Sequence, residues 1–358
     1  MTVSTRPALA GLHGYVPGRS PRDLGGAAVI KLSSNEAAFP PLPSVLKVAT
    51  DALAQMNRYP DMYAGALTAA LAGHHGLEPE WIAVTGGSSA LIRHLTEAYA
   101  GPGDEVLFGS PTFDVYATCA VIAGARPVAV PLSEGHVDFD QLRAAVTPRT
   151  KLIYICTPNN PTGTVVSHNE LSQFIASLPD GILVAVDEAY CHFVTSAGAA
   201  NGPALAREFE NVAVLRSFSK AYGLAGMRIG YCLARPKLLE VVRKVITPFS
   251  TASAAQEAAL ASLAEAAQRE LMQRVEQTIA ERSRVITALR ERGWKVPDSE
   301  ANFFWLALGE RAAELSAACE ANGFLVRIIH GEGVRVTIGT PRENDEFLAS
   351  PAISEGPW

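Results

Sequence analysis

Short apolar runs alternate with helical patterns of apolar and polar residues between residue 45 and residue 235. Runs of this length, bounded by turn residues, are typical of strands buried on both faces of a sheet. They lie at residues 105–108, 127–130, 151–156, 182–186, 212–215 and 229–233. Their alternation with helices predicts an α/β fold whose large domain has a mostly parallel sheet flanked by helices.

The pattern changes after residue 235. Stretches rich in Ala, Glu and Arg at residues 254–267 and 270–292 predict long helices, and short apolar runs at 303–308, 324–329 and 334–338 predict strands. We expect a smaller α+β domain here. The expected division is an N-terminal arm with the start of the small domain (1–44), the large domain (45–240) and the small C-terminal domain (241–358).

Composition narrows the class of protein. The chain has 358 residues, of which 48% are hydrophobic and 18% charged, with a net charge of -6. It is long enough for two cores, and neither a disordered chain nor a nucleic-acid-binding protein is indicated. No apolar run approaches the length of a membrane span and no secretion signal is apparent, so we expect a cytoplasmic protein. The five cysteines form no C-x-x-C pair, and we expect no metal site.

The densest group of reactive side chains follows the run at 212–215. Ser217, Ser219 and Lys220 lie within four residues, and Arg228 comes eight residues after the lysine. An aldehyde cofactor that carries a phosphate, such as pyridoxal phosphate, would find an amine for its aldehyde and donors for its phosphate here. The amine reacts only when uncharged, so burial or a cation such as Arg228 must lower its pKa. A solvated turn explains this motif equally well when it is taken alone.

A second motif indicates an anion-binding site. Gly86 and Gly87 precede Ser88 and Ser89 at the start of a predicted helix that runs to about Tyr99. Backbone N–H groups at a helix N-terminus bind anions, although a glycine turn with a serine cap is an equally good explanation. The glycine pattern of a dinucleotide-binding fold is absent, which argues against a nicotinamide cofactor.

Two further motifs follow buried strands, where ligands bind in open α/β sheets. One is the turn at residues 159–163, which contains Asn160 and also fits a simple proline-glycine turn. The other contains Asp187, which can pair with a protonated pyridine nitrogen, and Tyr190, which can reach the O3' oxygen of the same ring.

Two further residues are candidates for the binding site. Phe113 follows the run at 105–108 and can stack on a flat ring, although core packing is the commoner fate of a lone Phe. Arg335 lies inside an apolar strand, where its charge needs an acidic side chain or a substrate carboxylate as partner.

Together, the order and spacing of these motifs resemble the fold type I pyridoxal phosphate aminotransferases, and within them the histidinol-phosphate aminotransferase group. The resemblance runs nearly end to end. It is carried by residues 15–18, 32–36, 58–61, 159–163, 187–190, 217–228, 301–303 and 334–337.

The resemblance implies a role for each matching residue. Lys220 would form the Schiff base with the cofactor and carry protons, Asp187 would pair with the pyridine nitrogen, and Arg335 would bind the substrate α-carboxylate. Asn160 and Tyr190 would bind O3', and Phe113 would stack on the ring. The phosphate would be held by Ser88, Ser89, Ser217, Ser219, Arg228 and, from the other subunit of a homodimer, Tyr59.

The substrate is less clearly indicated. Residues 34–39, with Ala37, Ala38 and Phe39 after Asn35, depart from the histidinol-phosphate pattern and resemble the aromatic amino acid (phenylalanine) aminotransferases. We expect transamination of an aromatic amino acid with 2-oxoglutarate. Histidinol-phosphate transamination stays the alternative, because Arg327 and Tyr15 remain and can bind a phosphate. With Asn35 and Arg335, they are the residues expected to bind the substrate. A regulator without catalysis, and a lyase or decarboxylase on the same fold, are weaker alternatives.

Overall fold

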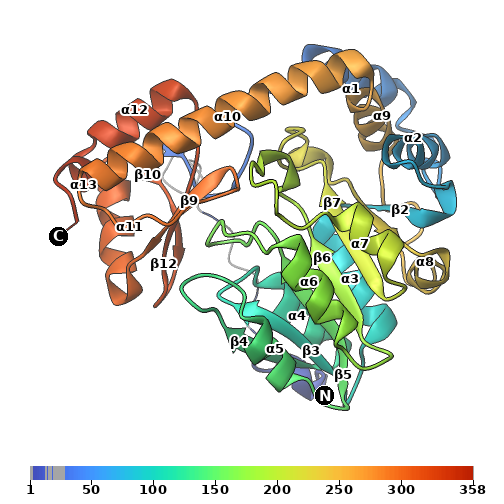
Figure 1. Ribbon diagram of the computed structural model, residues 1–358. Helices are drawn as coiled ribbons and strands as arrows, with labels where there is room; N and C mark the ends of the chain where they lie inside the picture. Colours follow the sequence, from blue (N-terminus) through green and yellow to red (C-terminus); the bar gives the residue numbers. More distant parts are fainter. Residues whose placement is uncertain (1–2, 13, 15–17, 19–28, 358) are drawn as a thin grey trace.

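The computed structural model describes residues 3–12, 14, 18 and 29–357 (Figure 1). The largest element is a seven-stranded sheet with the strand order β2-β8-β7-β6-β5-β3-β4. Its strands are β2 (Ile82–Thr85), β3 (Glu105–Ser110), β4 (Arg126–Pro131), β5 (Thr150–Cys156), β6 (Leu183–Asp187), β7 (Val212–Ser217) and β8 (Gly230–Ala234). All neighbours from β4 to β7 are parallel, and β8 is antiparallel to both β7 and β2. The mostly parallel sheet is therefore confirmed, whereas strand β2 was not predicted.

Alternate residues of the central strands enter two apolar cores, one on each face of the sheet. In β5, Ile153 and Ile155 enter the first core, and Leu152 and Tyr154 enter the second. Strands buried on both faces need helices on both faces. The first core is covered by α1 (Pro43–Ala52), α2 (Gly65–His75), α5 (Phe139–Ala145), α6 (His168–Ala176), α7 (Gly202–Glu208) and α9 (Ser253–Ser262). The second is covered by α3 (Ser88–Tyr99), α4 (Val115–Ala123) and α8 (Pro236–Arg243).

A smaller α+β unit holds a third core, as predicted. Its antiparallel sheet has the order β11-β12-β9, and β1 pairs with β10 in parallel. The strands are β1 (Ile30–Lys31), β9 (Phe303–Ala307), β10 (Phe324–Leu325), β11 (Arg327–Ile329) and β12 (Gly333–Thr337), and the helices are α11 (Ala312–Ala321), α12 (Pro341–Ala349) and α13 (Pro351–Ser354).

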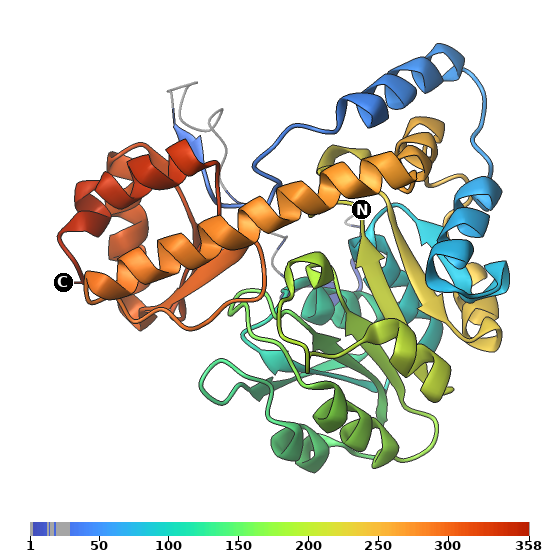
Figure 2. The same ribbon diagram turned by 45° about the horizontal axis from the view of Figure 1, so that its top comes forward.

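One long helix, α10 (Glu265–Glu291), joins the two units. Leu271 and Val275 lie in the first core, whereas Val285 and Leu289 lie in the third. At 27 residues the helix is about 40 Å long, and Figures 1 and 2 show it running from one unit to the other. The two units are thus fixed to one stiff element along one side, and the functional cavity described below lies between them.

Two sequence predictions need correction. The apolar run at 324–329 is not one strand, because β10 pairs with β1 while β11 pairs with β12, and the chain changes partner at Val326. The first long helix ends at Ser262 and the second begins at Glu265, earlier than the predicted break. Helix α9 packs in the first core although it follows residue 240. The domain limits at residues 44 and 240 stay a prediction.

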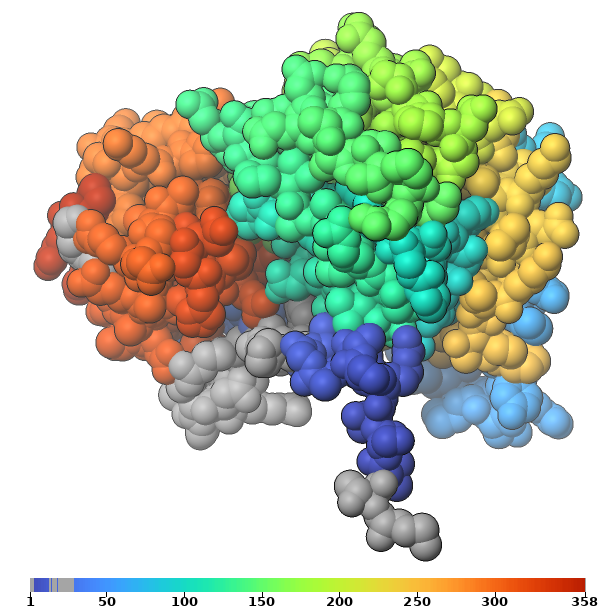
Figure 3. All heavy atoms as spheres, turned by 90° about the horizontal axis from the view of Figure 1, so that it is seen from below, coloured from blue at the N-terminus to red at the C-terminus, as the bar shows by residue number. Residues whose placement is uncertain are grey.

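The described part of the N-terminal arm lies against the large unit. A short 3₁₀ turn at Pro7–Leu9 follows Arg6, whose Nη1 donates to the carbonyl oxygen of Ile122 at 2.9 Å. Figure 3 shows these residues, in dark blue, on the outside of the molecule. None of the helices in the described residues combines the length and the apolar character that crossing a lipid bilayer requires.

Candidate active site

The structure brings nearly all the predicted site residues to one cavity between the large sheet and the small unit. The cavity has a volume of about 220 Å³. The predicted residues that line it are Asn35, Ser88, Ser89, Phe113, Asn160, Asp187, Tyr190, Ser217, Ser219, Lys220, Arg228, Arg327 and Arg335. Tyr59 does not line this cavity; it is 83% exposed and its ring lies 4.7 Å from that of Phe249. Tyr15 lies outside the described residues.

The sheet explains why these residues meet. Strands β5, β6 and β7 are parallel neighbours, so their carboxyl ends lie at one edge. Asp187 is the last residue of β6, and Lys220 follows the end of β7 by three residues. The turn containing Asn160 follows β5 at the same edge. Residues that are far apart in the sequence therefore face one cavity from adjacent strand ends.

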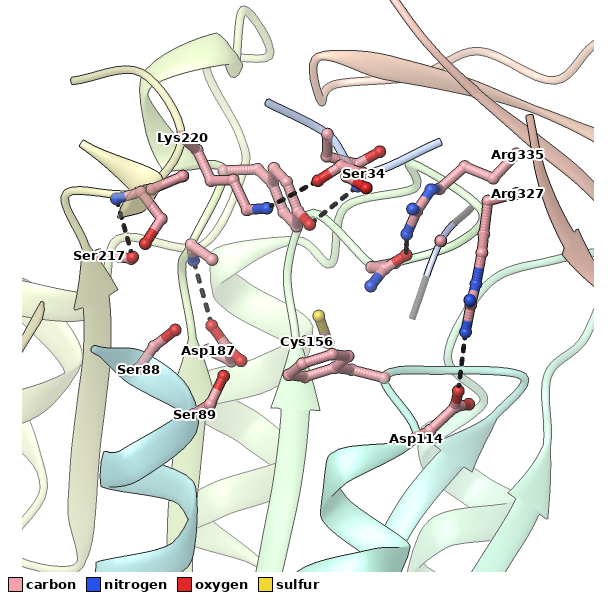
Figure 4. Close-up of a pocket in the computed structure, with 18 of the residues that line it drawn as sticks. Ser34, Ser88, Ser89, Asp114, Cys156, Asp187, Ser217, Lys220, Arg327 and Arg335 are labelled. Carbon is pink, nitrogen blue, oxygen red and sulfur yellow. Dashed lines mark hydrogen bonds and ion pairs between the residues drawn. The ribbon is translucent and has the colours of Figure 1, made fainter. Parts of the chain in front are cut away.

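Lys220 is the central side chain of the cavity. Its Nζ donates to the carbonyl oxygen of Ser34 at 3.4 Å (Figure 4). The same atom lies 5.6 Å from the centre of the Tyr190 ring. Burial lowers the pKa of Lys220 to about 7, and the positive charge of Arg335 adds to the effect. Arg228, the cation named from the sequence, makes a smaller contribution than Arg335. Near neutral pH a large fraction of the amine is uncharged and able to attack a carbonyl carbon.

Asp187 places a carboxylate on the floor of the cavity. Its Oδ2 accepts a hydrogen bond from Tyr116 Oη at 2.8 Å, and its Oδ1 accepts one from the backbone N–H of Ala189 at 3.1 Å. Burial raises the pKa of Asp187 to about 6, opposed by these hydrogen bonds and by the charge of Lys220. A buried carboxylate of this kind favours a cationic partner.

A group of residues suited to binding an anion lies at the part of the cavity where α3 begins. Gly87 has φ 100°, a backbone conformation that favours glycine, and a Cβ there would lie 2.7 Å from Arg228 Nη2. Arg228 Nη1 donates to Ser219 Oγ at 3.2 Å, and the backbone N–H of Ser219 donates to Ser217 Oγ at 3.0 Å. The N-terminal N–H groups of α3, two hydroxyls and a guanidinium therefore surround one small space suited to a phosphate.

The opposite wall comes from the small unit and the N-terminal segment. Arg335 Nη2 donates to the carbonyl oxygen of Ser33 at 2.7 Å, and its Nη1 donates to Asn160 Oδ1. Asn35 Nδ2 donates to Tyr190 Oη at 2.9 Å, which fixes the phenol above the cavity. These contacts tie residues 33–35 and β12 to the carboxyl ends of β5 and β6.

Sequence reasoning missed several residues that shape the site. Tyr116 is buried in α4 and stacks on Tyr154 with ring centres 4.5 Å apart, so its sequence pattern is that of a core aromatic residue. Asp114 and Thr112 line the cavity on either side of Phe113, and their position beside it was the available signal. Among the described residues, no group of three or more His, Cys, Asp or Glu side chains is placed to hold a metal ion.

Comparisons with known proteins identify the family of the chain. The family model for aminotransferase class I and II matches residues 27–350. Curated relatives called aromatic amino acid aminotransferase include those of Thermobifida fusca, which is 48% identical over 96% of this chain and 95% of its own, and Streptomyces coelicolor, which is 47% identical with the same coverage. The chain therefore belongs to the class I and II aminotransferases.

A solved structure is similar over almost its whole length. The histidinol-phosphate aminotransferase of Sinorhizobium meliloti, crystallised with pyridoxal-5'-phosphate, has a TM-score of 0.89 and 27% sequence identity, covering 99% of this chain and 98% of its own. The α/β fold with a mostly parallel sheet, predicted from the apolar runs, is thus the fold of this family.

The lowered pKa of Lys220 predicts a pH dependence in the cofactor-free protein. Folding lowers this pKa from an ordinary value near 10.5 to about 7, so the amine is protonated below pH 7 and uncharged above it. Labelling of Lys220 by an amine reagent, followed by peptide mass spectrometry, should rise through a midpoint near pH 7. The exposed Lys47 of the same molecule serves as the control. A Lys220 midpoint near pH 10 would contradict the account.

Proposed function

We propose that the chain is a pyridoxal phosphate-dependent aminotransferase that moves the amino group of an aromatic amino acid to 2-oxoglutarate. The observation that carries the proposal is the presence of a half-buried Lys220 with a lowered pKa and a buried Asp187 in one cavity. Curated relatives named aromatic amino acid aminotransferase, 43 to 48% identical, support the choice of substrate.

The residues present fit this cofactor. The cradle of Ser88, Ser89, Ser217, Ser219 and Arg228 would hold its phosphate. Asp187, whose pKa is raised by burial, would gain a cationic partner in a protonated pyridine nitrogen. Because Asn160 Oδ1 accepts from Arg335, its Nδ2 is left to donate to the O3' oxygen together with Tyr190. Phe113 lines the cavity where it would cover the ring.

The bound cofactor supplies an aldehyde and a ring that withdraws electrons from the substrate Cα. The protein would orient the substrate and transfer the proton of its Cα. Lys220 Nζ would hold the aldehyde at rest and, once displaced by the incoming amine, would remove the proton from the substrate Cα. Asp187 would keep the pyridine nitrogen protonated. Arg335 would bind the α-carboxylate with two parallel hydrogen bonds, which orients the Cα–H bond toward Lys220.

Histidinol-phosphate transamination is the second candidate. The observation that favours it is the similarity to the Sinorhizobium meliloti structure, together with the presence of Arg327 beside Arg335 in the cavity. Against it stands the resemblance of Ala37, Ala38 and Phe39 to the aromatic amino acid aminotransferases, a sequence argument only, because these residues line a separate hollow with Leu42 and Tyr222 and not the cavity of Lys220.

Substrate rates separate the two candidates. With 2-oxoglutarate as acceptor, kcat/KM for phenylalanine should exceed kcat/KM for histidinol phosphate by at least about tenfold, since a difference of about 1.4 kcal/mol in transition-state binding suffices. The measurement is the initial rate of keto-product formation by the holoenzyme. A preference for the phosphate ester would overturn the aromatic assignment while leaving the aminotransferase assignment intact.

We also propose a homodimer in which Tyr59 of one subunit reaches the cofactor phosphate of the other. Tyr59 is exposed, and the exposed side chains of Leu53, Met56, Tyr63 and Phe249 belong to the same or a contacting segment. Large exposed apolar side chains gathered in this way are typical of an interface. Tyr59 lies outside the cavity of its own chain, which suits a role across the interface.

Mixing two inactive variants tests this arrangement. Lys220→Ala and Tyr59→Ala subunits, combined in one dimer, should give one site with both changes and one intact site. Mixed dimers should therefore recover about half of the wild-type activity, because one of two sites works. If Tyr59 acted within its own chain, the mixture would show no more than the mean of its parents. A monomeric mass in light scattering would also reject the proposal.

A further inference from the structure

Two arginines project from neighbouring strands into the cavity. Arg327 of β11 and Arg335 of β12 are direct partners in the antiparallel register, so their side chains leave the same face of the small sheet. Both line the cavity (Figure 4). This gives the anionic group of a substrate two guanidinium groups within one site.

The two guanidiniums differ in their surroundings. Arg335 donates hydrogen bonds to the carbonyl oxygen of Ser33 and to Oδ1 of Asn160. Arg327 instead forms an ion pair with Asp114, with Nη2 and Oδ2 3.6 Å apart. Figure 4 shows the Arg327 side chain directed at this carboxylate. The two side chains come from opposite walls of the cavity, β11 and the N-terminus of α4.

Asp114 is placed where a helix-capping residue is expected, yet its carboxylate makes no capping hydrogen bond to the described residues of α4. It lines the cavity itself, and its side chain is 61% exposed. An exposed ion pair adds little to stability. Its charge nevertheless acts on any anion that enters the cavity beside Arg327.

The effect of Asp114 on binding depends on the charge of the substrate's anionic group. An α-carboxylate carries one negative charge and is satisfied by one guanidinium in two parallel hydrogen bonds. A phosphate ester carries about 1.5 to 2 negative charges near neutral pH and offers three acceptor oxygens, so it benefits from a second guanidinium. Asp114 offsets the charge of that second guanidinium and repels the ester.

We propose that Asp114 is a specificity-determining residue that favours amino donors with a carboxylate over donors with a phosphate ester in its place. The inference rests on the proposed aminotransferase function. Asp114 would act by an unfavourable electrostatic interaction with the phosphate ester. Destabilising the complex with a competing substrate is a general route to specificity.

The test compares two donors that share a side chain. Phenylalanine and 2-amino-3-phenylpropyl phosphate have the same ring and differ in the anionic group and in the methylene that carries the phosphate. For each holoenzyme we measure kcat/KM of both donors with 2-oxoglutarate, and take the ratio of phosphate ester to carboxylate. In Asp114→Asn this ratio should rise by about tenfold, since the variant removes one charge close to the anion. The gain over wild type should shrink as the salt concentration rises.

Three further variants isolate the cause. Asp345→Asn is the matched control, because Asp345 also pairs with an arginine, Arg284, and its side chain is 66% exposed; its ratio should equal that of the wild type. Asp114→Glu keeps the charge and should also keep the wild-type ratio. Adding Arg327→Gln to Asp114→Asn should lower the ratio again, because the ester then loses its second guanidinium.

An unchanged ratio in Asp114→Asn, or a ratio in the double variant no lower than that of Asp114→Asn, would overturn the inference. If the wild type transaminated phenylalanine and the Asp114→Asn ratio did not change, the proposed function would stand and the inference alone would fall. A wild type inactive on both donors would reject the proposed function.

Discussion

The site depends on one constraint, that the amine of a lysine is largely withdrawn from water beside a like-charged arginine. Burial removes the hydration that an ammonium group prefers, and Arg335 adds like charge, so the pKa of Lys220 falls to about 7. The same burial raises the pKa of Asp187 to about 6. Both shifts have one cause, the loss of hydration in a cavity between the two units.

The fold provides this constraint by closing the sheet edge with a second unit. The carboxyl ends of β5, β6 and β7 position Asn160, Asp187 and Lys220, and they would face solvent if the large unit stood alone. Residues 33–35 and Arg335 on β12 cover them. Helix α10 packs in the first and third cores, which keeps the covering wall in place.

Much of this could be predicted from the sequence, because the large unit follows local rules. Buried parallel strands are continuous apolar runs, and the polar residues directly after them, Asp187 and the turn at Asn160, lie at the strand ends. What could not be predicted depends on tertiary contacts. The change of partner at Val326, the hydrogen bond from Tyr116 to Asp187 and the ion pair of Asp114 with Arg327 join segments that are distant in sequence or hidden in an apolar pattern.

The most direct test of the central claim locates the amine that takes up the cofactor. The protein is incubated with pyridoxal phosphate, reduced with borohydride so that the linkage becomes permanent, and digested for peptide mass spectrometry. The account predicts that the added mass lies on Lys220 in nearly every molecule and that Lys220→Ala protein acquires none in the cavity. Stoichiometric labelling of another lysine, with Lys220 unmodified, would contradict it.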